Sequence, residues 1–297
     1  MARKLLIIVG PTAVGKTDWS IEAALRCGSP VISCDSRQIY REMSIGTAVP
    51  DAAALQAVRH YFIQTRSVTE PYSAGEYAAD ALALIEDLFA QGHETLVMAG
   101  GSGFYVDAVC AGAASGPPSD AAVRAELMRR LAEEGLEPLR EELRRRDPVA
   151  AGEMDLDNPR RVVRALEVCL ATGRPFSFFR QAAPPPRVFT IEKIGLTRPR
   201  AVLYERIDRR VTDMMEAGLL DEVRSLLPYR DLPALQTVGY RELFAWLDVE
   251  AGRAAPGDGY PSSLEEAADL IRRHTRNYAK RQLTWWRRDP SIRWTEL

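Results

Sequence analysis

Apolar residues follow two patterns along the chain, short continuous runs and stretches with a helical period. Leu5–Val9 is a continuous run, as expected of a strand buried on both faces. Three further strands are predicted over 30–34, 96–99 and 190–196. Apolar positions that recur every three or four residues predict helices over 16–26, 76–90, 120–146, 158–172, 199–227 and 264–288. The alternation of strands with helices favours an α/β fold with a parallel sheet.

The composition changes near residue 112. Ala113–Pro118 has the small residues and prolines of a linker, and the prolines at 184–186 mark a second boundary. Between them the chain is charged and helical. We therefore expect a helical insertion over 115–187, which interrupts a core formed by 1–114 and 188–297.

A phosphate-binding loop follows the first strand. Gly10–Thr17 reads GPTAVGKT and matches G-x-x-x-x-G-K-[ST] between a buried strand and a helix, the context that the motif requires. Its backbone N–H groups and the helix N-terminus suit phosphate oxygens. Lys16 can reach the outer phosphate, and the Thr17 hydroxyl is the usual Mg²⁺ ligand. The motif predicts phosphate binding without identifying ATP as the ligand.

Two other segments end predicted strands near this loop. The third strand ends in Ala99-Gly100-Gly101, with none of the acid that an ATPase places there to organise Mg²⁺. Asp35, after the second strand, should face the bound phosphate group, because parallel strands end at one edge. It can organise a metal, act as a general base, or merely form an Asx turn. Gly100–Tyr105 permits close backbone approach, for a substrate or for packing.

Charge is unevenly distributed, although the formal net charge is only −2. Window 158–187 has six arginines against one acidic residue, and window 272–297 has eight basic residues against two acidic ones. These windows carry +11 together, which leaves −13 for the rest and allows an anionic partner such as a nucleic acid. In the last helix Arg273, Arg276, Lys280 and Arg287 share one face by spacing, while Ile271, Tyr278 and Trp285 suit the core.

Location is suggested by what the sequence lacks. No apolar run is long enough to span a membrane, and the first run is too short for a signal peptide. The four cysteines are widely spaced, which argues against a zinc site or a disulfide framework. We expect a cytoplasmic protein with no membrane association.

Several of these segments together resemble the tRNA dimethylallyltransferases (isopentenyl-tRNA transferases) of the bacterial type. The resemblance spans nearly the whole chain in the family's order, and the Asp-Ser-Arg-Gln and Ala-Lys-Arg-Gln segments are specific to it. The matching segments are Gly10–Thr17, Asp35–Tyr40, Met43–Ala48, Gly100–Tyr105, Asn158–Val168, Arg206–Val211, Val238–Leu243 and Tyr278–Trp285.

The resemblance implies a P-loop NTPase-like core with a helical insertion that contacts the tRNA anticodon stem-loop. The reaction moves a dimethylallyl group from dimethylallyl diphosphate to N6 of the adenosine 3′-adjacent to the anticodon. Asp35 would be the general base, Lys16 and Arg210 would stabilise the leaving group, and Thr17 would help to hold Mg²⁺. The diphosphate-binding residues would be Gly10, Thr12, Ala13, Val14, Gly15, Lys16, Thr17 and Arg210, with Arg206 as second choice for the last.

The resemblance also implies a set of tRNA contacts, and we expect a monomer. From the core these are Asp35, Ser36, Arg37, Gln38, Ser102, Gln236, Gly239, Tyr240 and Arg241. From the insertion they are Arg124, Arg160, Arg161 and Arg164, and from the last helix Thr275, Arg276, Asn277, Lys280 and Arg281. Asp107 departs from the family, which often has a basic residue there, so no phosphate contact is carried over to it.

Three alternatives remain at this level. An isopentenyltransferase that acts on free adenine nucleotides would not need the insertion or the basic last helix. A small-molecule P-loop kinase is disfavoured by the missing strand-end acid. A non-catalytic, nucleotide-gated RNA-binding module would not need the chemistry of Asp35.

Overall fold

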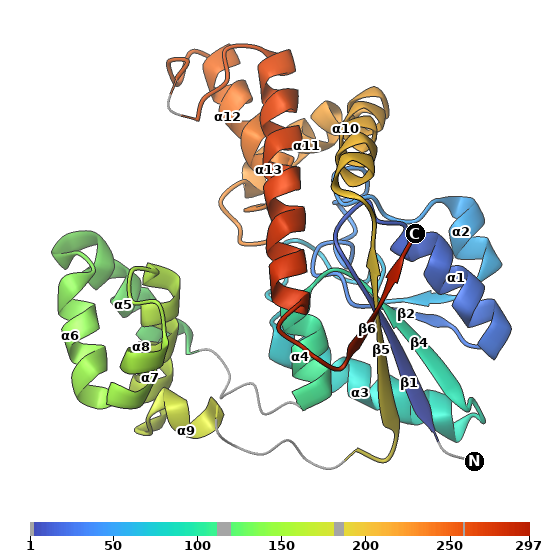
Figure 1. The fold of residues 1–297 in the computed structure, drawn as a ribbon. Helices are drawn as coiled ribbons and strands as arrows, with labels where there is room; N and C mark the ends of the chain where they lie inside the picture. The colour runs from blue at the N-terminus through green and yellow to red at the C-terminus, as the bar shows by residue number, and fades with distance from the viewer. Residues whose placement is uncertain (1–2, 112–119, 181–186, 258) are drawn as a thin grey trace. The chain divides into compact units, whose positions relative to one another are not determined.

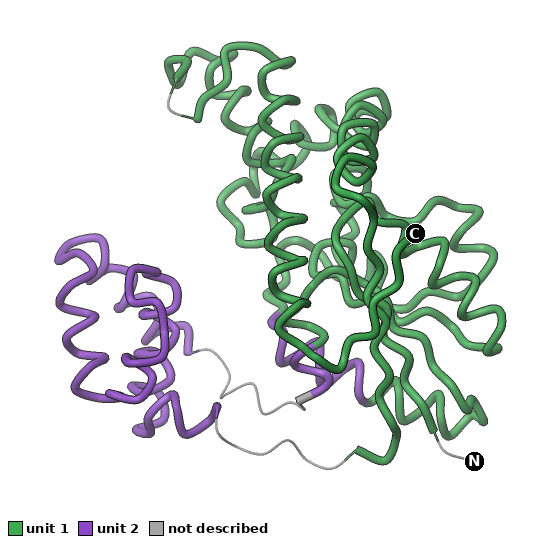
Figure 2. The backbone as a smooth tube through the Cα atoms, viewed as in Figure 1, with its two compact units in different colours: residues 1–72, 83–106, 187–297 green, residues 73–82, 107–186 purple. Residues whose placement is uncertain are grey.

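The computed structural model describes residues 3–111, 120–180, 187–257 and 259–297. Figure 2 shows two compact units, one formed by residues 1–72, 83–106 and 187–297 and the other by 73–82 and 107–186. The expected boundary at 114/115 lies outside the described residues.

A six-stranded sheet forms the centre of the first unit (Figure 1). Its order is β3-β2-β4-β1-β5-β6, and every neighbouring pair is parallel. The strands are β1 (Lys4–Val9), β2 (Val31–Ser33), β3 (His60–Tyr61), β4 (Thr95–Ala99), β5 (Thr190–Thr197) and β6 (Ile292–Glu296). The central strand β1 is buried from Leu5 to Val9 because both of its faces are covered. The expected α/β class with a parallel sheet is confirmed.

Helices occupy most of the remaining described chain. In the first unit these are α1 (Lys16–Cys27), α2 (Ala52–Ala57), α4 (Gly103–Ala111, which continues into the second unit), α10 (Arg200–Glu216), α11 (Leu219–Ser225), α12 (Tyr240–Glu250) and α13 (Leu264–Trp286), with a short 3₁₀ turn at Leu227–Tyr229. Helix α3 (Ala74–Ala90) belongs partly to each unit. The second unit has α5 (Ala121–Glu134), α6 (Glu137–Arg146), α7 (Pro148–Glu153), α8 (Pro159–Thr172) and α9 (Phe176–Arg180).

Two predicted long helices are each broken at a glycine. The segment 120–146 forms α5 and α6, separated at Gly135 with φ of 82°. The segment 199–227 forms α10 and α11, separated at Gly218 with φ of 96°. Both values lie in the left-handed region, which glycine adopts without strain and which ends a helix.

Two hydrophobic cores are packed in the first unit. One surrounds the β-strands and α1 and includes Ile8, Val14 and Ile207. The other joins the loop after β2 to α11, α12 and α13 and includes Met43, Leu243 and Ile271. None of the helices in the described parts of the chain is long and apolar enough to cross a membrane.

Candidate active site

The P-loop turns sharply between β1 and α1. Gly10 has φ of 151°, and a Cβ there would lie 2.7 Å from the Leu196 carbonyl oxygen. Ala13 and Gly15 follow with φ of 64° and 109°. Gly15 is the N-cap of α1, so the helix begins at Lys16 and directs its free N–H groups into the loop.

Lys16 is held inside this loop. Its Nζ donates to the carbonyl oxygens of Gly10 (3.0 Å) and Pro11 (2.9 Å). Burial and the nearby charge of Arg210 lower the pKa of Lys16 to about 8, against an opposing effect of Asp35. The ammonium group is therefore poised near an anion site and gains stabilisation when an anion enters.

Three arginines donate to successive residues of the P-loop. Arg210 Nη1 reaches Thr12 Oγ1 (3.3 Å), Arg206 Nε reaches the Ala13 carbonyl (2.8 Å) and Arg198 Nε reaches the Val14 carbonyl (2.8 Å). Burial and the charge of Arg206 lower the pKa of Arg210. A cavity of about 160 Å³ beside the loop is lined by Ala13, Arg206, Arg209, Arg210 and Asp213.

Arg198 was not among the expected site residues. It follows β5 directly, and parallel strands end at the ligand-binding edge. Its position directly after a strand therefore indicates a site residue. Arg210 and Arg206, the first and second choices from the resemblance, both lie at the loop.

Asp35 forms the Asx turn that was one alternative for it. Its Oδ1 accepts N–H bonds from Arg37 (2.8 Å) and Gln38 (3.3 Å). The carboxylate also acts electrostatically on both Lys16 and Arg210, which places it at the P-loop edge. A turn that uses Oδ1 orients the carboxylate and is compatible with a base role for Oδ2.

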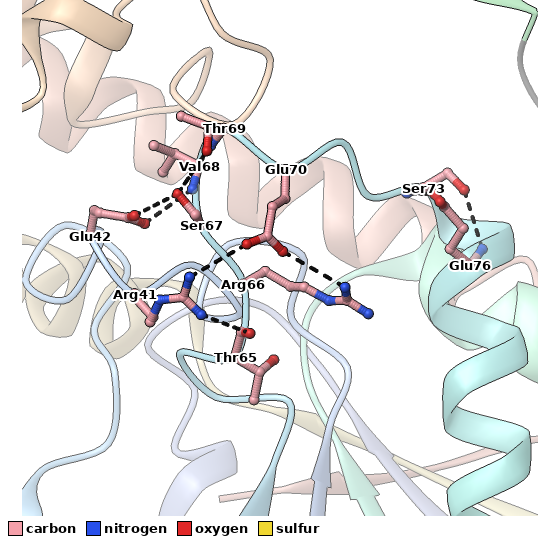
Figure 3. A network of polar contacts seen from close by, with 10 residues as sticks. All are labelled: Arg41, Glu42, Thr65, Arg66, Ser67, Val68, Thr69, Glu70, Ser73 and Glu76. Carbon is pink, nitrogen blue, oxygen red and sulfur yellow. Dashed lines mark hydrogen bonds and ion pairs between the residues drawn. The ribbon is translucent and has the colours of Figure 1, made fainter.

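The loop after Asp35 is fastened to the segment that follows β3. Gln38 donates through its amide to the carbonyls of Thr47 (3.1 Å) and Ala48 (2.8 Å), further along the same loop. Figure 3 shows the polar network beyond it, in which Glu42 accepts from Ser67 and Val68. In the same view Glu70 pairs with Arg41 and Arg66.

Glu222 on α11 anchors the far end of this loop. Its carboxylate accepts the backbone N–H groups of Ser44 (2.9 Å), Ile45 (2.7 Å) and Gly46 (2.9 Å) and the hydroxyl of Tyr240 (2.6 Å). The expectation that Tyr240 contacts tRNA is wrong for its side chain, because the side chain is wholly buried. Sequence reasoning missed Glu222, since its amide partners are remote in the chain.

The second glycine loop is closely packed. A Cβ at Gly100 would lie 2.5 Å from the Cys34 backbone, and one at Gly103 would collide with the Trp285 ring. Ser102 is half-buried, and its N–H donates to the Cys34 carbonyl (3.3 Å). The glycines are thus required for packing, and the loop lies against the residue that precedes Asp35.

Helix α13 differs from its predicted faces. Arg276 is engaged by Asp208 on α10 (2.5 Å) and lies over the Tyr204 ring (5.4 Å). Tyr278, expected in the core, is 38% exposed, and the buried side of α13 runs through Ile271, Ala279 and Gln282 instead. Lys280 and Arg281 are exposed, and Arg273 and Arg287 are exposed as well. Thr275 and Asn277 are half-buried.

In the second unit the expected arginines fall into two groups. Arg160 and Arg161 are exposed at the start of α8. Arg124 and Arg164 instead pair with Glu167, whose side chain is wholly buried (3.4 and 3.1 Å). In the first unit the Gln236 amide donates to the Arg230 carbonyl, while Arg241 is exposed and Gly239 precedes α12 with φ of 98°.

The donors present fit a magnesium ion held jointly with a diphosphate. No group of three or more His, Cys, Asp or Glu side chains among the described residues could hold a metal unaided. Mg²⁺, however, binds to proteins through one or two side chains and completes its shell with substrate phosphates and water. The Thr17 hydroxyl in the first turn of α1 would be such a ligand.

Comparison with known protein families excludes the kinase alternative. The model of a family described as IPP transferase matches residues 38–289. The chain belongs to the IPP transferase family. It is accordingly a transferase, and its P-loop is not that of a kinase.

Relatives of this IPP transferase are similar over at least nine-tenths of their own lengths. A tRNA dimethylallyltransferase of Bacteroides thetaiotaomicron is 46% identical over 290 residues, which cover 98% of this chain and 90% of the relative. Another from Phocaeicola vulgatus is 44% identical over 294 residues, which cover 99% and 94%.

Solved structures of the family have the same fold. A tRNA isopentenylpyrophosphate transferase from Bacillus halodurans is 38% identical with a TM-score of 0.67, covering 99% of this chain and 90% of its own. A eukaryotic dimethylallyltransferase acting on tRNA has a TM-score of 0.78 and covers 99% and 74%; at 24% identity it supports the fold alone.

Proposed function

We propose that this IPP transferase moves a dimethylallyl group from dimethylallyl diphosphate to N6 of the adenosine 3′-adjacent to the anticodon of tRNA. The observation that carries the proposal is the meeting of Lys16, Arg210 and Asp35 at one edge of the sheet. The two cations suit a leaving diphosphate, and the carboxylate suits a nucleophile that must lose a proton.

On the donor side, the P-loop is proposed to bind the diphosphate. Lys16 within the loop, and Arg206 and Arg210 beside it, would stabilise the charge that grows on the leaving oxygen. When bound, Mg²⁺ on the Thr17 hydroxyl would add further neutralising charge to the diphosphate. Allylic diphosphates ionise readily once this charge is stabilised, so electrostatics and positioning supply most of the catalysis.

On the acceptor side, the adenosine N6 forms a bond to the allylic carbon as the carbon–oxygen bond breaks. The N6 proton passes to Asp35, and diphosphate leaves with the bonding pair. The Asx turn supports this role because it fixes the carboxylate before the substrate arrives. Ser36, Arg37 and Ser102 lie on the protein loops beside Asp35 and are proposed to contact the flipped-out adenosine. A base leaves its stack more readily in a tRNA loop than in a duplex.

The exposed basic side chains are proposed to bind the anticodon stem-loop. These are Arg160, Arg161, Arg241, Lys280 and Arg281. Phosphate contacts from such residues give affinity without sequence readout. We also propose that the protein acts in the cytoplasm and as a monomer, with the helical insertion over 115–187 serving the tRNA.

Parallel incubations test the proposal. Labelled dimethylallyl diphosphate is supplied with undermodified tRNA or with AMP, and labelled ATP is supplied with tRNA. We expect label only in tRNA, from the allyl donor, at a nucleoside identified by digestion and mass spectrometry. Transfer to AMP would instead assign a nucleotide isopentenyltransferase. The absence of any transfer would overturn the proposal.

A further inference from the structure

We propose that Gln282 is a positioning residue that sets the spacing between the P-loop and the second glycine loop. The inference rests on the proposed function, because it concerns how the donor and acceptor are brought together. Gln282 lies on α13, and neither the phosphate motif nor the basic face of that helix includes it.

One side-chain amide connects the two loops. Gln282 Oε1 accepts the backbone N–H of Thr12 (2.8 Å), and Nε2 donates to the carbonyl of Gly101 (2.9 Å). Gln282 is only 6% exposed; its bond to Gly101 is buried and its bond from Thr12 is partly buried, so a lost partner is costly. A glutamine amide suits this bridge because its oxygen accepts a hydrogen bond and its NH₂ group donates one.

The bridge lies beside the reacting groups. Lys16 Nζ is 3.8 Å from the position of a Cβ at Gly101, and Gln282 Nε2 fills the same space still more closely. Because Thr12 donates its N–H to Gln282, that N–H is withdrawn from the anion cradle. Thr12 would therefore bind the diphosphate through its hydroxyl, which Arg210 already contacts, and not through its N–H as expected.

The two connected loops belong to different substrates. Thr12 belongs to the loop proposed to hold the diphosphate, and Gly101 precedes Ser102, proposed to face the adenosine. The same helix carries the exposed cations Lys280 and Arg281. Gln282 therefore joins the donor loop, the acceptor loop and a tRNA-facing helix through a single amide.

Gln282→Met tests this role, because methionine keeps the length and bulk of the side chain but forms neither bond. We expect the KM for dimethylallyl diphosphate and the Kd for inorganic diphosphate to rise about tenfold, with kcat reduced. The Kd for tRNA alone should stay within about twofold, because the exposed cations are untouched. The matched control is Gln91→Met, an exposed glutamine after α3, which should leave all of these values unchanged.

Gln282→Glu adds a readout that mere loss of packing would not give. An ionised Glu accepts from Thr12 but repels the Gly101 carbonyl and the diphosphate, whereas a protonated Glu restores both bonds. Relative to wild type at each pH, its defect should therefore shrink as pH falls from about 8 to about 5.

Two results would overturn the inference. One is an unchanged donor KM and diphosphate Kd in folded Gln282→Met; the other is a pH-independent defect in Gln282→Glu. Inorganic diphosphate binding needs no tRNA or transfer, so it separates failure of this inference from failure of the proposed function.

Discussion

Arg276 on α13 forms an ion pair with Asp208 on α10, with its Nε 3.1 Å from Oδ1 and its Nη2 2.5 Å from Oδ2. Helix α10 also carries Arg206 and Arg210, so the pair connects the proposed tRNA helix to the helix that holds the P-loop. Arg276 was expected to contact tRNA, and the structure gives it an internal partner instead.

The pair gives a prediction that separates the two roles. Asp208→Asn and Arg276→Ala should each raise the donor KM a few-fold, because a half-exposed ion pair contributes only about 1 kcal/mol. Neither variant should change the salt dependence of tRNA binding. Arg281→Ala should reduce that salt slope by about one. Adding Arg276→Ala to it should reduce the slope no further. A second reduction, measured by filter binding over a salt series, would make Arg276 a phosphate contact.

Asp35→Asn isolates the proton transfer from the turn. Asparagine keeps the oxygen that accepts from Arg37 and Gln38 but is not a base. Single-turnover transfer should slow by roughly 10²–10⁴-fold while tRNA affinity is retained. Asp35→Ala should lose the turn as well and be less stable. If Asp35→Asn transfers at close to the wild-type rate, another group must accept the proton.

Lys16 predicts how donor binding depends on pH. Its pKa in the free protein is about 8, lowered by burial and by Arg210, and a bound diphosphate favours the charged form. Donor affinity should therefore be high below this pKa and decline as pH rises through it. In Lys16→Met, affinity should be weaker throughout and flat over that range. A wild-type profile without a break near pH 8, measured by calorimetry, would contradict the assignment.

Gly100 should tolerate no side chain. A Cβ there would lie 2.5 Å from the backbone of Cys34, and backbone atoms cannot swing aside as a side chain does. Gly100→Ala should therefore lower the free energy of unfolding by about 2 kcal/mol or more. Gly152→Ala in α7 is the control, since nothing lies within 4 Å of its Cβ position. It should be neutral or stabilising by about 0.5–1 kcal/mol in urea unfolding.

Glu167 should be required for the stability of the insertion helices. Its buried carboxylate accepts the Asp120 N–H (3.0 Å) and pairs with Arg124 and Arg164. Glu167→Ala leaves these groups without their partner and should cost about 3 kcal/mol. Replacing the exposed Arg160 and Arg161 by alanine should instead weaken tRNA binding with no loss of stability. The opposite pattern in thermal unfolding and tRNA titration would reverse these roles.

The fold and the donor half of the site could be predicted because they depend on local sequence. The P-loop motif lies between Val9 and α1, and both are visible as a run and a period. The elements α2, α7, α9, α12, β3 and β6 were not predicted, and most of them are too short to give a clear periodicity. The breaks at Gly135 and Gly218 were missed since each glycine lies inside an otherwise continuous helical pattern.

The supporting contacts could not be predicted, because they join residues distant in sequence. Glu222 holds amides 176–178 residues away, and Gln282 holds an amide 270 residues away. Charge alone also misled, since a basic face does not show which cation has an internal partner. Arg276 and Arg164 are paired within the fold, whereas Arg281 and Arg160 are exposed.

The edge strand β6 has a practical consequence for handling the protein. It pairs with β5, the Leu297 N–H donates to the Thr197 carbonyl (2.9 Å), and the Leu297 side chain is 3.6 Å from a Cβ position on Gly15. Any residues joined after Leu297, native or added, therefore emerge beside the P-loop. An affinity tag or fluorescent label placed there would report on donor binding and compete with it. One attached before β1 would instead start at the amino ends of the strands, opposite the P-loop.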